Sequence, residues 1–481
     1  MLKRLCCAVL FLLACSCYGC TVGPNYGKPK LEVSKQWSEL PASGVAGGSP
    51  VADITRWWST FGDAQLDSLI DRAVQSNTDL RLAKARIREA RARKGIVAAD
   101  LFPTVDVSAS YSRLRPGQNS TPEGSGTGGE QDLFQAGFDA NWEIDVFGGV
   151  RRGVEAARAD IEAAEEDRRD VLVTLLSDVA QNYIGVRGNQ LRIAITRVNI
   201  VAQQKTLELT EGRYNAGLGN ELEVAQARAQ LSDTVSRVPV FETAVKRSIH
   251  RLGVLLGQEP GALLAELSAD APIPPTPPEV PVGLPSDLLR RRPDVRRAER
   301  EIAAATARIG VATADLFPKF FLTGSLGQQS VSFSDIAAPA SRFWSIGPSV
   351  SWPVFDGGRI RANIKVQDAK QEQALVIYEK TVLTALEDME NALVAYSKEQ
   401  ATRLSLAESV ESYLKAVTVS TELYSKGLTD FLNVLVTQRA LYQSQDALAE
   451  SSQRVSTNLV ALYKALGGGW EASYPGETAT Q

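Results

Sequence analysis

Two stretches of the chain alternate between apolar and polar residues, which is the pattern of a β-strand with one apolar face. From Phe134 to Val146 every second residue is apolar or small, and the positions between them are acidic, polar or glycine. Trp344 to Val354 repeats the pattern, with serine and glycine on the other face. A shorter run with weaker alternation precedes each stretch. We therefore predict two hairpins, with the weaker strands at 104–112 and 320–328 and the connecting loops at 116–129 and 330–341.

These strands fit two settings, and the pattern alone does not decide between them. A half-buried sheet of a soluble domain turns its apolar face to a core, whereas a membrane barrel turns it to lipid. An open sheet of four strands cannot sit in lipid, because its edges would leave backbone groups without hydrogen bonds. Sharing between chains would close it: two chains give eight strands, and three give twelve, which is wide enough for a channel.

Helical spacing of apolar residues covers most of the remaining chain. The stretch from Arg151 to Asn215 has no proline, so a continuous helix there would be a rod of roughly 100 Å. Rods of that length are typical of coiled coils, although periodicity alone also fits a simple helical bundle. The predicted helices are 64–99, 151–215, 221–256 (bent or broken at Pro239), 287–314, 359–426 and 430–466.

The chain is a duplication of one unit of about 210 residues. Landmarks recur in the same order: Ala99-Asp-Leu-Phe-Pro103 as Ala314-Asp-Leu-Phe-Pro318, Trp142 as Trp352, Gly217-Leu218 as Gly427-Leu428, and Leu256-Gly257 as Leu466-Gly467. We place the first repeat at 63–270 and the second at 287–467. The segment 271–286 between them is rich in proline and is predicted to be an extended linker without helix or strand.

Charge and cysteine content narrow the classes of function. The 481-residue chain has a net charge of −4, which argues against a nucleic-acid partner because such a protein needs a basic face. His250 is the only histidine, so neither a histidine metal site nor a Ser-His or Cys-His nucleophile pair is expected. All five cysteines lie between Cys6 and Cys20, so the rest of the chain can form no disulfide. We predict no catalytic residues, no metal site and no cofactor.

The first residues have the layout of a secretory signal. Lys3 and Arg4 precede an apolar stretch, 5–14, that is too short to cross a bilayer as a helix. Small residues then lead into cysteines, which resembles the signal of a bacterial lipoprotein. In such proteins the cysteine at the cleavage site becomes the first mature residue and carries the lipid. The candidates are Cys15, Cys17 and Cys20.

Several longer motifs carry a resemblance to a known family. They are Cys20-Thr-Val-Gly-Pro-Asn-Tyr26, Leu289-Arg-Arg-Arg-Pro-Asp-Val295, Ala314-Asp-Leu-Phe-Pro318, Trp352-Pro-Val-Phe-Asp-Gly-Gly358 and Phe431-Leu-Asn-Val-Leu435. With these motifs and the order hairpin, long helical pair, hairpin, long helical pair, the chain resembles the TolC-like outer-membrane efflux family. It is most similar to the lipid-anchored ducts of resistance-nodulation-division pumps. The fold implied is a membrane β-barrel joined to an α-helical coiled-coil barrel. Each protomer would supply four strands and long helical hairpins, and a trimer would close twelve strands.

The resemblance also implies a function. The chain would form a homotrimeric exit duct that passively conducts drugs or other small molecules out of a tripartite pump. Its partners would be a periplasmic adaptor, an inner-membrane transporter of the resistance-nodulation-division type and outer-membrane lipid. Mature chains of the family begin with a motif like that at Cys20, so we choose Cys20 as the lipidated residue. The signal peptide is then 1–19, a lipidated extended segment spans 20–62, and 468–481 is a C-terminal tail. No candidate cysteine is followed by aspartate, which implies the outer membrane.

In the family, two helix-to-helix turns form the periplasmic tip and receive the adaptor. They match residues 214–219 and 424–429, and the expected docking residues are Gly217, Leu218, Gly219, Gly427, Leu428 and Thr429. The family's closed tip uses a tyrosine, an acidic residue paired with arginine, and an aspartate ring. Thr429 stands at the arginine position and Asn433 at the ring position, so a neutral constriction is expected. Its predicted residues are Glu223, Tyr424, Thr429, Asp430 (a helix N-cap or a pore charge) and Asn433.

Three other functions remain as alternatives. A duct for type I protein secretion would have the same architecture. A periplasmic adaptor lipoprotein also has long helical hairpins and a lipid, but not the duplication or the lipid-type strands. An envelope lipoprotein hydrolase would need a nucleophile motif such as Gly-x-Ser-x-Gly or metal-ligand spacing, and the sequence has neither. We therefore expect a conduit and not an enzyme.

Overall fold

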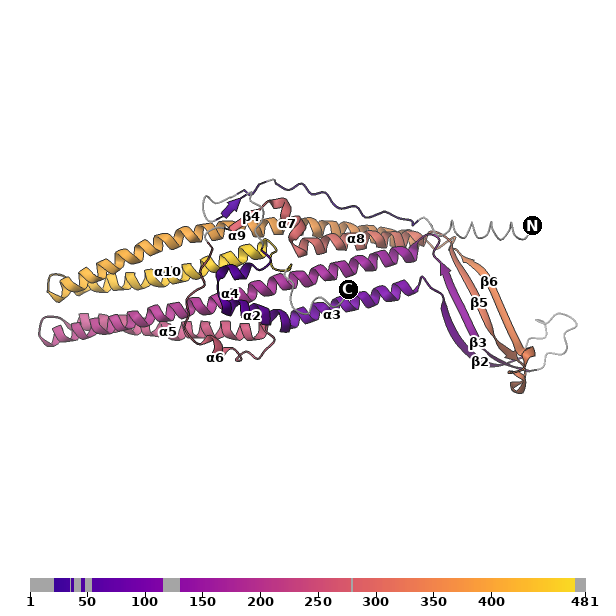
Figure 1. The fold of residues 1–481 in the computed structure, drawn as a ribbon, viewed down its shortest axis with the longest axis horizontal. Helices are drawn as coiled ribbons and strands as arrows, with labels where there is room; N and C mark the ends of the chain where they lie inside the picture. The colour runs from indigo at the N-terminus through magenta and orange to yellow at the C-terminus, as the bar shows by residue number, and fades with distance from the viewer. Residues whose placement is uncertain are drawn as a thin grey trace. The chain divides into compact units, whose positions relative to one another are not determined.

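The structure is a computed structural model, and it describes residues 21–34, 36–38, 45–47, 54–115, 130–277 and 280–471. Signal peptide 1–19 and the three candidate lipidation cysteines lie outside these residues. The chain forms two compact units. We call Met1–Lys30, Arg86–Ala164 and Arg297–Tyr378 the sheet unit, and Leu31–Ala85, Glu165–Arg296 and Glu379–Gln481 the core unit. Long helices run from one unit into the other (Figure 1).

The elements follow the predicted order. The first repeat contains β2 Thr104–Leu114, β3 Gln131–Ile144, α4 Gly149–Asn215, α5 Glu221–Leu255 and α6 Leu264–Leu267. The second contains α8 Pro293–Ala314, β5 Lys319–Ser330, η2 Phe333–Asp335, η3 Pro339–Ser341, β6 Arg342–Ser351, α9 Arg359–Ser425 and α10 Phe431–Ala465. Helices α2 Ala64–Ser76 and α3 Thr78–Ala99 open the first repeat, and α7 Pro285–Arg291 leads into the second. The segment before the first repeat carries β1 Val45–Gly47 and η1 Trp57–Phe61, and the linker carries β4 Val280–Gly283.

The two repeats agree closely in their helices. Both α4 and α9 have 67 residues, and both α5 and α10 have 35. The same number of residues separates Gly217 from Gly427, the start of α4 from the start of α9, and the start of α5 from the start of α10. Helices α3 and α8 have 22 residues each. The predicted long rods are therefore confirmed, and the duplication extends to the lengths of the elements.

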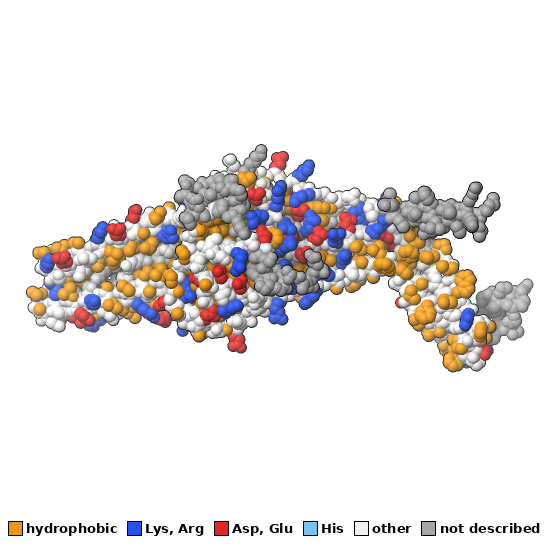
Figure 2. All heavy atoms as spheres, viewed as in Figure 1, with side chains coloured by type: hydrophobic (Ala, Val, Ile, Leu, Met, Phe, Trp, Pro, Cys, Tyr) orange, Lys and Arg blue, Asp and Glu red, His pale blue; other side chains and the backbone are white. Residues whose placement is uncertain are grey.

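The two hairpins join into one antiparallel sheet of order β2-β3-β5-β6 in the sheet unit (Figure 1). The register places Val107 opposite Phe138, Phe138 opposite Leu326, and Leu326 opposite Trp344. This apolar row crosses all four strands, and its side chains are 74%, 55%, 59% and 75% exposed. Hydrophobic atoms are also prominent over the strands in Figure 2. In the part of the chain that the structure describes, this face covers no core.

A row of opposite character crosses the same sheet. It runs from Asp106 to Asp139, Ser325 and Ser345, which stand opposite one another in register. The hydroxyls of Ser325 and Ser345 lie 2.7 Å apart, within hydrogen-bond distance. Because side chains of successive residues point to opposite faces, this polar row and the apolar row lie on different faces of the sheet. The sheet is thus amphipathic across its full width.

The strands pass into the helices through contacts that both repeats share. Trp142 Nε1 donates to Leu101 O at 3.0 Å, and Trp352 Nε1 donates to Leu316 O at 3.0 Å. Asp145 accepts backbone N–H groups at the start of α4, and Asp356 does so at the start of α9. The N–H groups of Ile360 and Gly358 hold the pKa of Asp356 below its usual range. A carboxylate at a helix N-terminus is favourable because it satisfies unpaired donors there.

The N-terminal segment is fastened to the sheet unit at the same level. Val22 N donates to Phe147 O at 3.1 Å. Arg152, only 3% exposed, donates to Val22 O at 3.1 Å and to Asn25 Oδ1 at 2.7 Å. Gly23 has φ 89°, and a side chain there would collide with the backbone of Gly310. The glycine in the motif that follows Cys20 therefore allows this segment to pack closely against the sheet unit; we call this packed position the seat of the N-terminal segment.

The core unit has a large apolar centre that brings both repeats and the N-terminal region together. Trp57 of η1 stacks on Tyr463 of α10 at 5.2 Å and meets Trp58 edge-on at 5.8 Å. Tyr183 of α4 is buried and donates to Asp63 Oδ2 at 2.7 Å. Asp63 in turn caps α2 by accepting from Gln65 N and Leu66 N. Among the described helices, none combines the length and apolarity needed to cross a membrane.

Two expectations were wrong in detail. Helix 64–99 is divided at Asn77, whose Oδ1 accepts from Asp79 N and Leu80 N and so starts a new helix. Helix 287–314 is divided at Arg292, because the following proline disfavours helical geometry there. Helix α5, in contrast, continues through Pro239.

The linker also differs from expectation. Its end carries β4, which pairs in parallel with β1 from the N-terminal segment. A proline-rich segment can still contribute a short strand at the edge of a small sheet.

Replacement of Arg152 tests the seat of the N-terminal segment. Arg152→Ala removes charge-assisted hydrogen bonds, each of which contributes about 1.5–3 kcal/mol. At the lower value, 21–30 would detach about tenfold more often. Limited proteolysis should show cleavage in 21–30 accelerated to that extent. Arg158→Ala, which removes an exposed arginine of the same helix, should leave cleavage unchanged. Equal rates in the two variants would contradict the seat.

Candidate functional site: the helical tips

The two turns at the ends of the helical pairs have the same geometry. Gly217 and Gly427 each have φ 73°. Gly217 N donates to Tyr214 O and Leu218 N to Arg213 O, at 2.9 and 2.8 Å. Gly427 and Leu428 make the equivalent bonds at 2.9 Å each. This pair of bonds is a Schellman motif, in which a left-handed glycine lets the chain leave the helix. Both turns thus reverse the chain in the way that the glycines predicted.

The return helices begin differently. Asn220 caps α5 by accepting from Glu223 N at 3.0 Å. Asp430 occupies the N-cap position of α10, but its side chain makes no capping hydrogen bond. Asn433 Nδ2 instead donates to Thr429 Oγ1 at 2.7 Å. Two of the residues predicted for the constriction therefore lie together as a neutral pair.

Three side chains connect the two tips, and we call them the tip latch: Arg213, Glu223 and Tyr424. Tyr424, only 2% exposed, donates its hydroxyl to Glu223 Oε2 at 2.8 Å. The Arg213 guanidinium lies over the tyrosine ring, 4.7 Å from its centre. Arg213 also donates to Leu218 O at 3.2 Å. The latch joins the end of α4, the start of α5 and the end of α9.

Burial and the hydrogen bond to Glu223 raise the pKa of Tyr424 to about 12. The structure thus brings together Glu223 and Tyr424 as predicted positions, and it adds Arg213, which sequence reasoning missed. The available signal was a basic residue in the last turn of α4, where it is favoured by the helix dipole.

The predicted docking residues are accessible at both tips. Leu218 and Leu428 are 67% and 70% exposed. Leu222 and Leu432, one turn further along, are also exposed. Exposed leucines that recur at equivalent positions on two tips form an apolar surface, which is typical of a protein-binding site. Gly219 and Thr429 complete the two turns.

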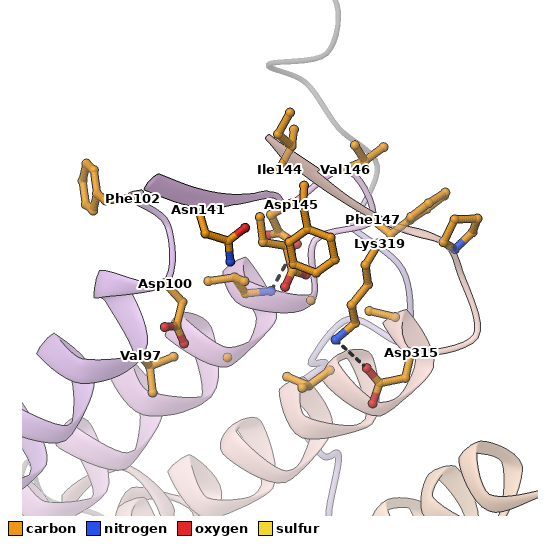
Figure 3. A pocket seen from close by; sticks show the side chains of 18 of the residues that line it. Val97, Asp100, Phe102, Asn141, Ile144, Asp145, Val146, Phe147, Asp315 and Lys319 are labelled. Atoms are coloured by element: carbon orange, nitrogen blue, oxygen red, sulfur yellow. Dashed lines mark hydrogen bonds and ion pairs between the residues drawn. The ribbon is translucent and has the colours of Figure 1, made fainter. Parts of the chain in front are cut away.

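A concave region lies in the sheet unit, where the strands meet the helices (Figure 3). It is a pocket of about 370 Å³ lined by residues of both repeats. Two of the carboxylates that line it are in ion pairs: Asp315 Oδ1 lies 3.1 Å from Lys319 Nζ, and Asp145 Oδ2 lies 3.2 Å from Arg151 Nε. Among the described residues, no group of three His, Cys, Asp or Glu side chains is placed to hold a metal ion. The pocket is therefore interpreted as part of the strand-to-helix junction.

Removal of the latch hydroxyl tests its contribution. Tyr424→Phe should lose about 1.5 kcal/mol of local stability, the lower value for one hydrogen bond to a charged group. Amide hydrogen exchange in 213–223 and 424–433 should then be faster by about tenfold. Tyr413→Phe is the matched control on the same helix and should change nothing. Unaltered exchange in Tyr424→Phe would contradict the latch.

The pH dependence of the latch follows from the raised pKa. The hydroxyl stays protonated in the folded chain up to about pH 12, whereas an unfolded tyrosine titrates near pH 10. The contribution of Tyr424 is therefore fully present below about pH 10 and is lost between about pH 10 and 12. The difference in exchange between wild type and Tyr424→Phe should stay constant from about pH 7 to 9.

Comparisons with known proteins place the fold. The sequence model described as "Outer membrane efflux protein" matches residues 69–258 and 284–468, one stretch in each repeat. The pyoverdine export outer membrane protein OpmQ of Pseudomonas aeruginosa is 36% identical over 452 residues, covering 93% of both chains. Nodulation protein T of Rhizobium leguminosarum bv. trifolii is 31% identical over 458 residues, covering 94% of this chain and 95% of its own.

The solved structure of the outer-membrane channel OprN has a TM-score of 0.88 and 39% identity, and covers 94% of this chain and all of its own. Family members are outer-membrane efflux channels with a long helical extension into the periplasm. These findings confirm the predicted helical barrel with a β-domain, the outer-membrane location and the role as an efflux duct, and they exclude both the adaptor and the hydrolase. The chain belongs to the outer membrane efflux protein family.

Proposed function

We propose that three copies of this chain close one twelve-stranded barrel in the outer membrane and one helical tunnel below it. Family members are trimeric components of tripartite pumps that work with an adaptor and an inner-membrane transporter. The duct conducts small molecules passively, and its energy comes from the inner-membrane partner. No bond of the cargo is made or broken.

The amphipathic sheet is the observation that carries this proposal. Its apolar row is exposed in one chain, and among the described residues its two edge strands, β2 and β6, have no neighbour on their outer side. In lipid, every backbone donor and acceptor needs a partner, so the edges must be paired by other copies. Three sheets of four strands give the twelve strands that enclose a channel. The apolar row then faces lipid, and the row from Asp106 to Ser345 faces the water-filled interior.

The fastened N-terminal segment supports Cys20 as the lipidated residue. Thr21 is in close contact with Gly148, between the end of β3 and the start of α4. A lipid on the preceding residue would enter the membrane at the level where the strands begin. Lipidation at Cys15 or Cys17 would add a spacer of several residues before that seat.

The exposed tip leucines support docking of the periplasmic adaptor. The adaptor would contact Leu218 and Leu428 together with the glycines of the two turns, and a transporter of the resistance-nodulation-division type would lie beyond it. The neutral pair Thr429–Asn433 supports a constriction without a cation-binding ring. Asp430 adds an exposed carboxylate beside it. Within each chain the tip latch would hold the constriction narrow.

Mass measurements test the assembly and the anchor together. Protein extracted from outer-membrane fractions in mild detergent should have three times the mass of one chain. The N-terminal peptide should carry lipid on Cys20, and Cys20→Ser should abolish it, whereas Cys15→Ser and Cys17→Ser should not. A monomer would contradict the shared barrel, and lipid on Cys15 or Cys17 would contradict the assignment of Cys20 as the lipidated residue.

Substitution of the tip leucines tests adaptor docking. Leu218→Asp together with Leu428→Asp should weaken adaptor capture by in-cell cross-linking at least tenfold. Burial of a leucine contributes about 1.5–3 kcal/mol, and about 1.4 kcal/mol corresponds to tenfold in affinity. Val331→Asp, an exposed apolar residue after β5, is the matched control. If both variants capture the adaptor like the wild type, the docking surface lies elsewhere.

A further inference from the structure

The helices of the two repeats meet within one chain along a polar contact in the core unit. We call it the inner seam. Arg192 donates to both carboxylate oxygens of Asp446, at 2.7 and 2.8 Å. Asn199 Nδ2 donates to Gln445 Oε1 at 2.7 Å. Gln438 Nε2 donates to Thr206 Oγ1 at 2.8 Å. The inner seam thus joins one face of α4 to one face of α10.

The duplication assigns a counterpart to every residue of the inner seam. Because the offset that separates Gly427 from Gly217 holds from the start to the end of each long helix, α4 corresponds to α9 and α5 to α10. The α4 face of the seam corresponds to a face of α9, and the α10 face corresponds to a face of α5. The counterparts are Thr402, Ser409 and Ala416 on α9, and Ser236, Val235 and Arg228 on α5.

The α5 counterparts are accessible within one chain. Val235 and Ser236 are exposed, and Arg228 pairs with Glu211 of the adjacent α4, at 2.9 Å. Among the described residues, no hydrogen bond or ion pair joins these three side chains to the α9 counterparts.

The α9 side is also available to a partner. Thr402 is exposed, while Ser409 and Ala416 are partly exposed, and the Ser409 hydroxyl lies 3.4 Å from that of Ser444 on α10. The same face continues one heptad beyond Ala416 at Leu423 of α9, whose apolar side chain is also exposed. A helix face with apolar residues that its own chain leaves uncovered needs a covering partner.

We infer that a second copy of this chain occupies this face, with its α5 against α9 in the register of the inner seam. This inference rests on the proposed trimer and gives it a residue-level interface, the outer seam. Thr402 then stands beside Ser236 of the neighbouring copy, Ser409 beside its Val235, and Ala416 beside its Arg228. A face on α9 that fits a different face on α5 is a head-to-tail contact, which closes a ring when the rotation is right.

The two seams differ in chemistry at equal height. The inner seam has a bidentate ion pair where the outer seam has two hydroxyls, Thr402 and Ser236. It has two amides where the outer seam has a serine and a valine, Ser409 and Val235. The ring would therefore alternate between seams held by directional polar bonds inside chains and seams held by smaller, less polar contacts between chains.

Cysteine cross-linking tests the register directly, because the chain after Cys20 has no cysteine of its own. The outer pairs are Ser409→Cys with Val235→Cys, and Ala416→Cys with Arg228→Cys. The inner pair, Asn199→Cys with Gln445→Cys, is the matched control. Full-length variants in outer-membrane vesicles are treated with a short bifunctional maleimide. On denaturing gels, the outer pairs should give species of two and three chains. The inner pair should stay at the mass of one chain with both thiols consumed.

Further controls define the outcomes that would overturn the inference. An off-register pair, Thr402→Cys with Arg228→Cys, should give no cross-linked chains, and neither should any single variant. Native mass in mild detergent is measured on the same samples. A native trimer whose outer pairs do not cross-link, or whose off-register pair does, overturns the register and leaves the duct intact. A native monomer of the wild type overturns the proposed trimer itself.

Discussion

Backbone hydrogen bonding in lipid is the constraint on which the rest of the structure depends. A sheet that places an apolar row outward has no water to satisfy its edges, so a chain with four strands is incomplete by itself. In the proposed duct, the edge strands of neighbouring copies pair with one another, and the helices that continue from the strands therefore have the same threefold arrangement. At both junctions a tryptophan bonds to the backbone just after the preceding helix, and an aspartate caps the helix that follows, so each hairpin is tied to the helices on both sides of it.

The core unit meets a different requirement. Helices of 67 residues cannot each be stabilised by one compact centre, and their apolar residues are spread around the helix axis. The structure concentrates apolar burial around Trp57, Trp58 and Tyr463, where the N-terminal region crosses both repeats. Further toward the tips, a smaller apolar cluster forms around Phe431 and Val434, and the inner seam and the tip latch add polar contacts beside it. A region with a small apolar cluster opens more readily than one with a large packed centre.

Sequence reasoning recovered the plan of the fold because the informative signals were local or repeated. Alternation located the strands, and the absence of proline located α4. What it missed depended on tertiary context. A proline inside a helix costs about 3 kcal/mol in isolation, yet α5 continues through Pro239. There the proline side chain is exposed, and neighbouring turns of a 35-residue helix hold the backbone in place. The tip turns were predictable from their glycines, whereas Arg213 was one of many arginines until the structure placed it over Tyr424.

The equal lengths of the paired helices restrict how such a chain can change over evolutionary time. The path from the end of α3 at Ala99 to Trp142 is slightly longer than the path from the end of α8 at Ala314 to Trp352, and from there onward the repeats stay in step. The difference is thus absorbed within one hairpin, so a hairpin loop can lengthen in one repeat alone. One residue inserted into α4 alone would advance its tip by about 1.5 Å and rotate it by about 100° relative to its counterpart. Insertions in the long helices are thus expected to survive only when both halves of the gene acquire them together.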